Sequence, residues 1–216
     1  MFDHRTVSLA DQVFERLEND ILSGKYAHGE VLTENKLVAE LGTSRTPIRE
    51  AIKRLEQEHI VAIDQRGIHI LGVTPKDVAD IFDLRIRIEG LAAERAAENI
   101  TDEELAELKE SLDLQEFYLM KHDAGRITFQ DSRFHELIYK FSRSTVIRDT
   151  LFPLHNKTQK YRRALVQNKG RAAGSIEEHA AIYEAIAAHN GKLAAERMTE
   201  HVTHAKEHLL SEEGEE

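Results

Sequence analysis

The chain has 216 residues, and 41% of them are hydrophobic, which is enough to build one large folded domain or two small ones. It contains 3 prolines and no cysteine, so disorder is not favoured, and disulfides and thiolate metal ligands are excluded. The net charge is −10, which argues against a broadly basic nucleic-acid-binding surface. The start of the chain lacks a secretory signal pattern, and no apolar stretch approaches the ~20 residues of a membrane span. We therefore expect a soluble cytoplasmic protein with no membrane partner.

The first part of the chain predicts three helices followed by a small β-hairpin. Residues 8–23 place apolar side chains on one helical face. Thr33 is a suitable N-cap for a short second helix that ends at Gly42, and Ser44 is suitable for the start of a third. Two β-rich runs joined by a turn follow within residues 60–71.

The rest of the chain predicts helices only. The amphipathic segments lie at 76–99, 101–122, 125–142, 145–168, 174–189 and 191–210, with a break expected at the glycines of 170–174. We expect a mainly α protein with one domain at 1–72, a linker at 73–76, an all-α six-helix bundle at 77–211 and an acidic tail at 212–216.

The stretch TSRTPIRE, residues 43–50, indicates a small cationic helix start within this acidic chain. Arg45, Thr46, Arg49 and Lys53 form a polar arc opposite the apolar stripe of the third helix. A helix N-terminus attracts phosphate, and arginine reaches guanine in a major groove. The alternative is that these charges only solvate an exposed face. The preceding short helix, the tight turn and the hairpin favour a helix-turn-helix.

The segment ENKLVAELGTSRTPIREAIKRLEQEHIV, followed by RGIHI, resembles the winged helix-turn-helix of the GntR family of bacterial transcription regulators. The resemblance covers most of residues 8–71 and implies binding to double-stranded operator DNA. It implies DNA contacts at the positions that match the family motif, which are Ser44, Arg45, Thr46 and Arg49 in the third helix and Arg66 and Gly67 at the tip of the wing.

Three positions depart from the pattern of this family. Asn35 stands where many members have an arginine that contacts the operator, and Thr43 replaces the usual valine. His59 replaces a glycine that ends the third helix, so we expect His59 to adopt a left-handed backbone conformation at a small cost in stability.

Four polar side chains fall on apolar faces of the helical part: Asp131 and His135 at i, i+4 spacing, His179 and His201. Such groups are costly to bury unless they are paired. One interpretation is a hydrogen-bonded Asp–His network in the core. The other is a metal site, in which one helix supplies two ligands and two further helices supply one each.

The helical part also resembles the FCD domain of the FadR subfamily. The similar segments are LRIRIEGLAAERAA, DSRFHELI and EEHAAIYEAIAAHN, together with His201. The resemblance implies a divalent metal held by Asp131, His135, His179 and His201, and such ligands accept Zn, Ni or Mn. The six predicted helices indicate the VanR-like group of this subfamily, and Thr145 replaces a frequent asparagine.

A metal with these four ligands leaves one or two positions open for a small carboxylate effector. Arg85, Tyr161 and Arg162 are candidates to bind that effector, although surface ion pairs would explain them equally well.

The sequence favours a ligand-responsive repressor and not an enzyme. In this hypothesis a homodimer binds an operator with two half-sites, and the effector changes the bundle. A metal-dependent hydrolase is one alternative, but no general base accompanies the four ligands. A metal-independent helical binding module is the other.

Overall fold

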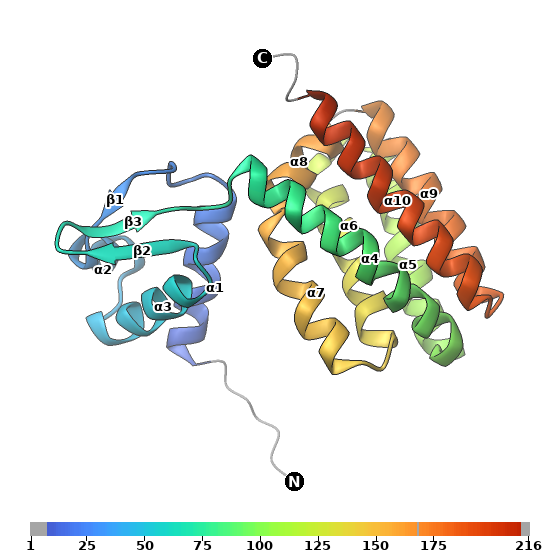
Figure 1. The fold of residues 1–216 in the computed structure, drawn as a ribbon, viewed down its shortest axis with the longest axis horizontal. Helices are drawn as coiled ribbons and strands as arrows, with labels where there is room; N and C mark the ends of the chain where they lie inside the picture. The colour runs from blue at the N-terminus through green and yellow to red at the C-terminus, as the bar shows by residue number, and fades with distance from the viewer. Residues whose placement is uncertain (1–7, 168, 213–216) are drawn as a thin grey trace, which may run out of the picture. The chain divides into compact units, whose positions relative to one another are not determined.

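A computed structural model describes residues 8–167 and 169–212 of the protein. The chain forms two compact units, Met1–Pro75 and Lys76–Glu216 (Figure 1). The predicted acidic tail lies outside the described residues except for Glu212, which ends the last helix.

The first unit contains three helices and, within the described part, a three-stranded antiparallel sheet. Its elements are α1 (Leu9–Leu22), β1 (Val31–Leu32), α2 (Glu34–Leu41), α3 (Arg45–Gln57), β2 (Val61–Asp64) and β3 (Gly67–Ile70). The strand order is β1-β3-β2, and Val31 lies opposite His69. The three helices and the β2–β3 hairpin confirm the winged helix-turn-helix prediction, whereas the two-residue strand β1 was missed.

Local chemistry sets the helix boundaries of this unit. The Thr33 hydroxyl accepts a hydrogen bond from the Lys36 N–H at 3.2 Å, and Gly42 ends α2 with a left-handed φ of 62°. Ser44 is the N-cap of α3, although among the described residues its side chain has no capping hydrogen bond. His59 follows α3 with φ 58°, which confirms the expected left-handed conformation.

The apolar stripe of α3 forms the centre of the first core. Ile48 and Ala51 are fully buried, and Leu55 is almost so. They belong to one hydrophobic cluster with residues of α1 and all three strands. Because this face is buried, the opposite face of α3 is left for solvent or a ligand.

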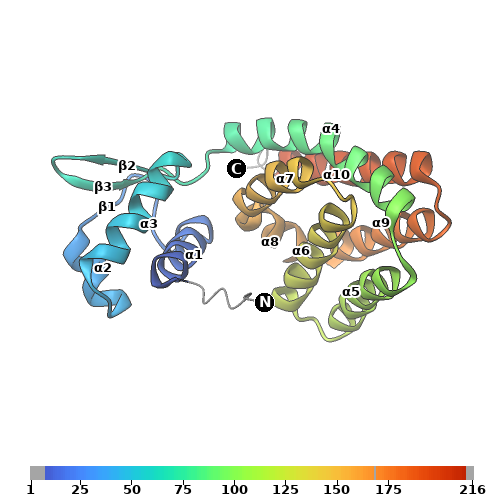
Figure 2. The same ribbon diagram turned by 90° about the horizontal axis from the view of Figure 1, so that it is seen from below.

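The described part of the second unit contains seven helical segments. They are α4 (Pro75–Asn99), α5 (Asp102–Met120), α6 (Ala124–Phe141), α7 (Thr145–Lys157), α8 (Gln159–Gln167), α9 (Lys169–Ala187) and α10 (Gly191–Glu212). Helix α6 packs against α5, α7 and α8, and α9 packs against α5 and α10 (Figure 2). Within these residues, no helix is long and apolar enough to span a bilayer.

Two details of the helix count differ from the sequence prediction. The predicted helix at 145–168 is divided at Thr158, whose N–H and hydroxyl both donate to the His155 carbonyl. Conversely, α9 continues through Gly170 and Gly174, where a break was predicted. Isolated glycines are tolerated in a helix that packing supports. The count of seven segments does not match the six from which the VanR-like group was inferred.

Gly67 provides a test of the wing's backbone. Its φ is 139°, and a Cβ at this position would lie 2.6 Å from the Leu32 carbonyl oxygen of β1. We therefore expect Gly67→Ala to lower the free energy of unfolding by about 2 kcal/mol or more, because strain and a backbone clash act together. Gly29→Ala is the control: its φ is 80°, but among the described residues no atom beyond its chain neighbours lies within 4 Å of its Cβ position, so its loss is smaller. Urea unfolding of both variants measures the difference, and equal losses would contradict the clash.

Candidate DNA-binding face and metal centre

Helix α3 presents the predicted DNA-contacting side chains on its solvent face. Ser44, Arg45, Thr46, Arg49 and Lys53 are all exposed. The free N–H groups of the α3 N-terminus lie at the same end as Arg45 and Thr46, and these suit a phosphate. The structure thus brings the predicted residues of this helix onto one face.

Two residues of α2 hold the arginines of this face. The Nη2 group of Arg45 donates to Oδ1 of Asn35 at 3.0 Å, and Nε of Arg49 donates to both Glu34 oxygens at 2.9 and 3.0 Å. Sequence reasoning missed the role of Glu34. Glu34 opens α2, the helix that precedes α3, but sequence spacing alone does not show that its carboxylate meets Arg49.

The wing tip is organised by an aspartate. Oδ1 of Asp64 accepts hydrogen bonds from the backbone N–H groups of Arg66 at 2.7 Å and Gly67 at 3.2 Å. Ring nitrogen Nε2 of His69 also lies 2.7 Å from this oxygen. Arg66 is exposed, as a DNA contact requires, whereas Gly67 is half-buried and has the structural role described above.

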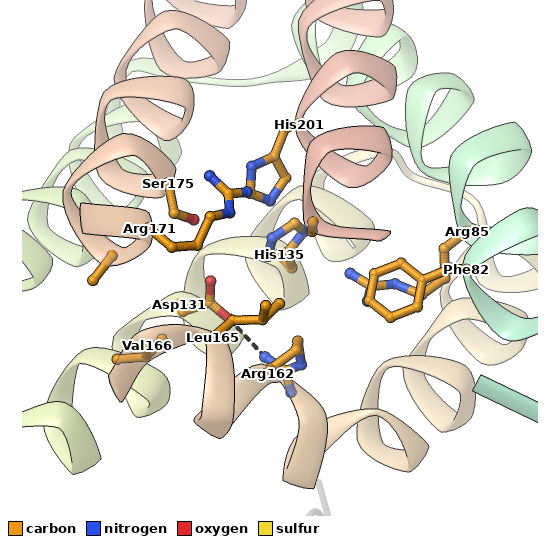
Figure 3. A pocket seen from close by; sticks show the side chains of 12 residues that line it. Phe82, Arg85, Asp131, His135, Arg162, Leu165, Val166, Arg171, Ser175 and His201 are labelled. Carbon is orange, nitrogen blue, oxygen red and sulfur yellow. Dashed lines mark hydrogen bonds and ion pairs between the residues drawn. The ribbon is translucent and has the colours of Figure 1, made fainter. Parts of the chain in front are cut away.

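The four residues predicted as metal ligands come together in the core of the second unit. Asp131 and His135 lie on α6, His179 on α9 and His201 on α10, and all four are buried. One ligand nitrogen from each histidine lies within 4.8 Å of the others. The Asp131 carboxylate lies 3.8 Å from Nε2 of His179. Figure 3 shows Asp131, His135 and His201 around one cavity.

Each of the three histidine rings is held through Nδ1 by a different acceptor. Nδ1 of His135 donates to Glu89 at 2.8 Å, and that of His201 donates to Glu178 at 2.7 Å. In His179, Nδ1 donates to the Gln115 amide oxygen at 2.8 Å. Metal-bound histidines are usually oriented in this way by a second layer of acceptors.

This arrangement favours one tautomer of each neutral ring. With the proton on Nδ1, each neutral ring presents an Nε2 lone pair. Nε2 of His179 lies 3.2 Å from Nε2 of His201, so two lone pairs face each other. Burial and the neighbouring histidines hold the pKa of His179 well below its usual value. Converging lone pairs with one adjacent carboxylate fit a divalent cation better than they fit a neutral hydrogen-bonded network.

The three supporting acceptors were not predicted from the sequence. Glu89 and Gln115 lie on the buried faces of their helices, and each is almost fully buried. Their positions on α4 and α5 could have indicated buried polar partners, but sequence spacing cannot show which histidine each one meets.

Asp131 is also paired with an arginine. Nη1 of Arg162, on α8, donates to the Asp131 carboxylate at 2.6 Å and to the Ser132 hydroxyl at 3.0 Å. Burial alone would raise the pKa of Asp131, but Arg162 and the three neighbouring histidines together outweigh it, so the pKa lies well below its usual range. Asp131 is therefore an anion in this core, as a metal ligand must be.

A small cavity of about 30 Å³ lies beside the cluster. A single water occupies ~10–15 Å³ on this scale, so about two waters would fill it. Arg85 and Arg162 line it with Asp131, His135 and His201 (Figure 3). Of the predicted effector residues, Tyr161 is half-buried and does not belong to the described lining.

Further polar side chains near the cavity were not predicted. Arg171 and Ser175 of α9 also line it. His155 is fully buried, and its Nε2 has no hydrogen-bond partner among the described residues. With Glu89 and His135, His155 forms a second group of possible ligands, but Nε of Arg85 already donates to Glu89 at 2.5 Å. That cation makes the second group less suitable for a metal ion.

A winged helix-turn-helix followed by a helical bundle with a polar cavity defines a class of two-domain DNA-binding regulators. Residues 9–70 match the family described as "Bacterial regulatory proteins, gntR family", and residues 80–204 match the "FCD domain" family. The chain belongs to the GntR family of transcription regulators and carries an FCD domain. The family and its characterised relatives are transcription regulators and not enzymes, so this protein is a ligand-responsive DNA-binding regulator.

Relatives support the same assignment. The chain is 31% identical over 209 residues to the uncharacterized HTH-type transcriptional regulator YdhC of Bacillus subtilis, covering 95% of this chain and 93% of that protein. It is 38% identical over 120 residues to the gluconate operon transcriptional repressor of Bacillus licheniformis, covering 56% of this chain and 49% of the repressor. The solved structure of E. coli McbR/YncC has a TM-score of 0.83 at 24% identity, covering 96% of this chain and 99% of that one, which shows a shared fold.

The Asp131–Arg162 pair provides a test of the cavity's electrostatics. Arg162→Gln leaves a buried carboxylate without its cation, so we expect the metal-free protein to lose ~3–5 kcal/mol of unfolding free energy. Arg148→Gln is the matched control, because Arg148 pairs with Asp149 at the surface and such pairs contribute ~0–1 kcal/mol. Chemical unfolding in the presence of a chelator measures both, and a loss below 1 kcal/mol for Arg162→Gln would contradict the pairing.

Proposed function

We propose that this regulator is a homodimeric repressor whose helical domain holds a divalent metal through Asp131, His135, His179 and His201. In this proposal residues 1–72 bind operator DNA and residues 77–211 bind the metal and a small carboxylate effector. The observation that carries the metal proposal is the convergence of Nε2 lone pairs from rings whose Nδ1 groups are all engaged. A bound metal would supply a positive centre with open positions for an anionic ligand.

Arg85 and Arg162 are the proposed effector-binding side chains. Both line the cavity beside the metal cluster, and each can form a bidentate pair with a carboxylate. Because the cavity is small, a carboxylate larger than about two waters requires α8 or its neighbours to move. That movement is the proposed link between the effector and the DNA-binding unit.

The proposal that the protein binds DNA as a repressor rests on two observations. The predicted DNA-contacting side chains are exposed on one face of α3, and one relative of this protein is named as a transcriptional repressor. A single head makes few contacts, so two heads of a dimer would read two half-sites. Glu34 and Asn35 orient the arginines before DNA arrives, which reduces the entropy lost on binding.

Metal content tests the first proposal. Asp131→Ala and His179→Ala each remove a ligand, so we expect metal per chain, measured by elemental analysis of protein purified without a His-tag, to fall clearly below that of the wild type. His189→Ala is the control, because Nδ1 of His189 bonds to the Ala97 carbonyl, away from the cluster. Mass spectrometry of the same wild-type sample identifies any carboxylate that co-purifies. Unchanged metal content in both ligand variants would refute the site.

Binding to DNA upstream of the protein's own gene tests the second proposal. Arg45→Ala and Arg49→Ala each remove a base or phosphate contact, and we expect each to weaken specific binding by about ten- to a hundredfold. Arg16→Ala removes an exposed cation from α1 and is the matched control. Fluorescence anisotropy at fixed salt compares the DNA affinity of these three variants with that of the wild type. Equal binding by the wild type and the Arg45→Ala, Arg49→Ala double variant would reject this face.

A further inference from the structure

His201 separates the internal cavity from an open surface groove. It lines the cavity together with Asp131 and His135, and it also lines a groove of about 560 Å³ between α9 and α10. Helices α9 and α10 lie side by side in both views of the fold (Figures 1 and 2). Among the four proposed ligands, only His201 belongs to the described lining of this groove. The ligand supplied by α10 is therefore the one that faces outward.

Glu178 lines the groove and holds His201 on the side that faces it. Its carboxylate accepts hydrogen bonds from Nδ1 of His201 at 2.7 Å and Nδ1 of His204 at 2.9 Å. Both terminal amino groups of Arg171 also donate to it, at 3.1 and 3.0 Å. The Glu178 side chain is 23% exposed, whereas that of Glu89, which supports His135, is fully buried. The supports of the cluster thus differ in their access to solvent.

The groove carries charge that suits a cation. Glu177, Glu178, Glu184 and Glu200 line it together with Arg197, His201 and His204, so its described lining has more carboxylates than groups that can be cationic. Carboxylates concentrated in a groove raise the local concentration of divalent cations and speed their association. His204 also bonds to Glu178, and its side chain is about half exposed. It could therefore offer a ring nitrogen to a cation that moves from solvent toward His201.

We propose that the metal ion enters and leaves the core along the α9–α10 groove, and that Glu178, held by Arg171, is the group that closes this route. The proposal rests on the metal site proposed above. Opening requires Glu178 to release His201, so the hold of Arg171 on Glu178 sets how often the route opens. A weaker hold accelerates entry and exit together.

Arg171→Lys tests the closing group without changing the net charge. Lysine cannot reproduce the two parallel hydrogen bonds to Glu178, so we expect the rates of Co²⁺ uptake and release to rise together by about tenfold, with a nearly unchanged dissociation constant. Stopped-flow absorbance of the Co²⁺ ion measures uptake, and excess chelator measures release. Arg197→Lys is the control, because Arg197 lines the same groove but pairs with Glu200, and its rates should stay as in the wild type.

Ala181→Leu tests the route by narrowing the groove, which should slow metal exchange instead of accelerating it. Ala181 lines the groove and is neither a proposed ligand nor one of the residues that hold the ligands, so a larger side chain there should slow uptake and release several-fold. Ala106→Leu, on the exposed face of α5, adds the same side chain outside the groove and should leave both rates unchanged.

The outcomes separate this inference from the metal proposal itself. If the wild type takes up no Co²⁺, the metal site fails. If it binds Co²⁺ but Arg171→Lys raises only the release rate, Glu178 merely positions His201 and the route is refuted. Wild-type rates in both Arg171→Lys and Ala181→Leu would also refute it.

Discussion

Charged side chains buried in the helical bundle impose the constraint on which its core depends. Arg85, Glu89, Asp131 and Arg162 are all more than nine-tenths buried, and an isolated charge in such a place would be very costly. Each cation is therefore paired with a carboxylate, Arg85 with Glu89 and Arg162 with Asp131. The pairing explains why Glu89 stays ionised: burial would raise its pKa, but Arg85 and His135 lower it well below its usual range.

These carboxylates serve two partners at once, and this connects the cavity to the histidine cluster. Glu89 accepts from Arg85 on one oxygen and from His135 on the other. Asp131 accepts from Arg162 while its second oxygen faces His179. An anion that draws either arginine toward itself must weaken its bond to a carboxylate that belongs to the proposed metal site. Effector and metal binding would then be coupled, and such coupling is reciprocal.

The sequence was sufficient to predict what local patterns determine. Capping residues, apolar stripes and the turn after β2 located the elements of the first unit, because these signals act within a few residues. Strand β1 was missed because two residues carry no periodicity, and their pairing with His69 and Ile68 is a tertiary contact. The i, i+4 pair of Asp131 and His135 could be placed on one face of a helix. The assignment of Glu89, Gln115 and Glu178 to particular rings could not be predicted, because it depends on how separate helices pack.

The two arginines of α3 differ in what their α2 partners leave available for DNA. Glu34 engages Nε of Arg49, whereas bidentate recognition of guanine uses terminal amino groups, so orientation by Glu34 and contact with a base are compatible. Asn35 instead occupies a terminal amino group of Arg45, which a base or phosphate would have to share or displace. An arginine at position 35 would repel Arg45 and add a cation. On the proposed DNA-binding face, Asn35 would therefore order Arg45 without the added attraction to phosphate that an arginine would bring.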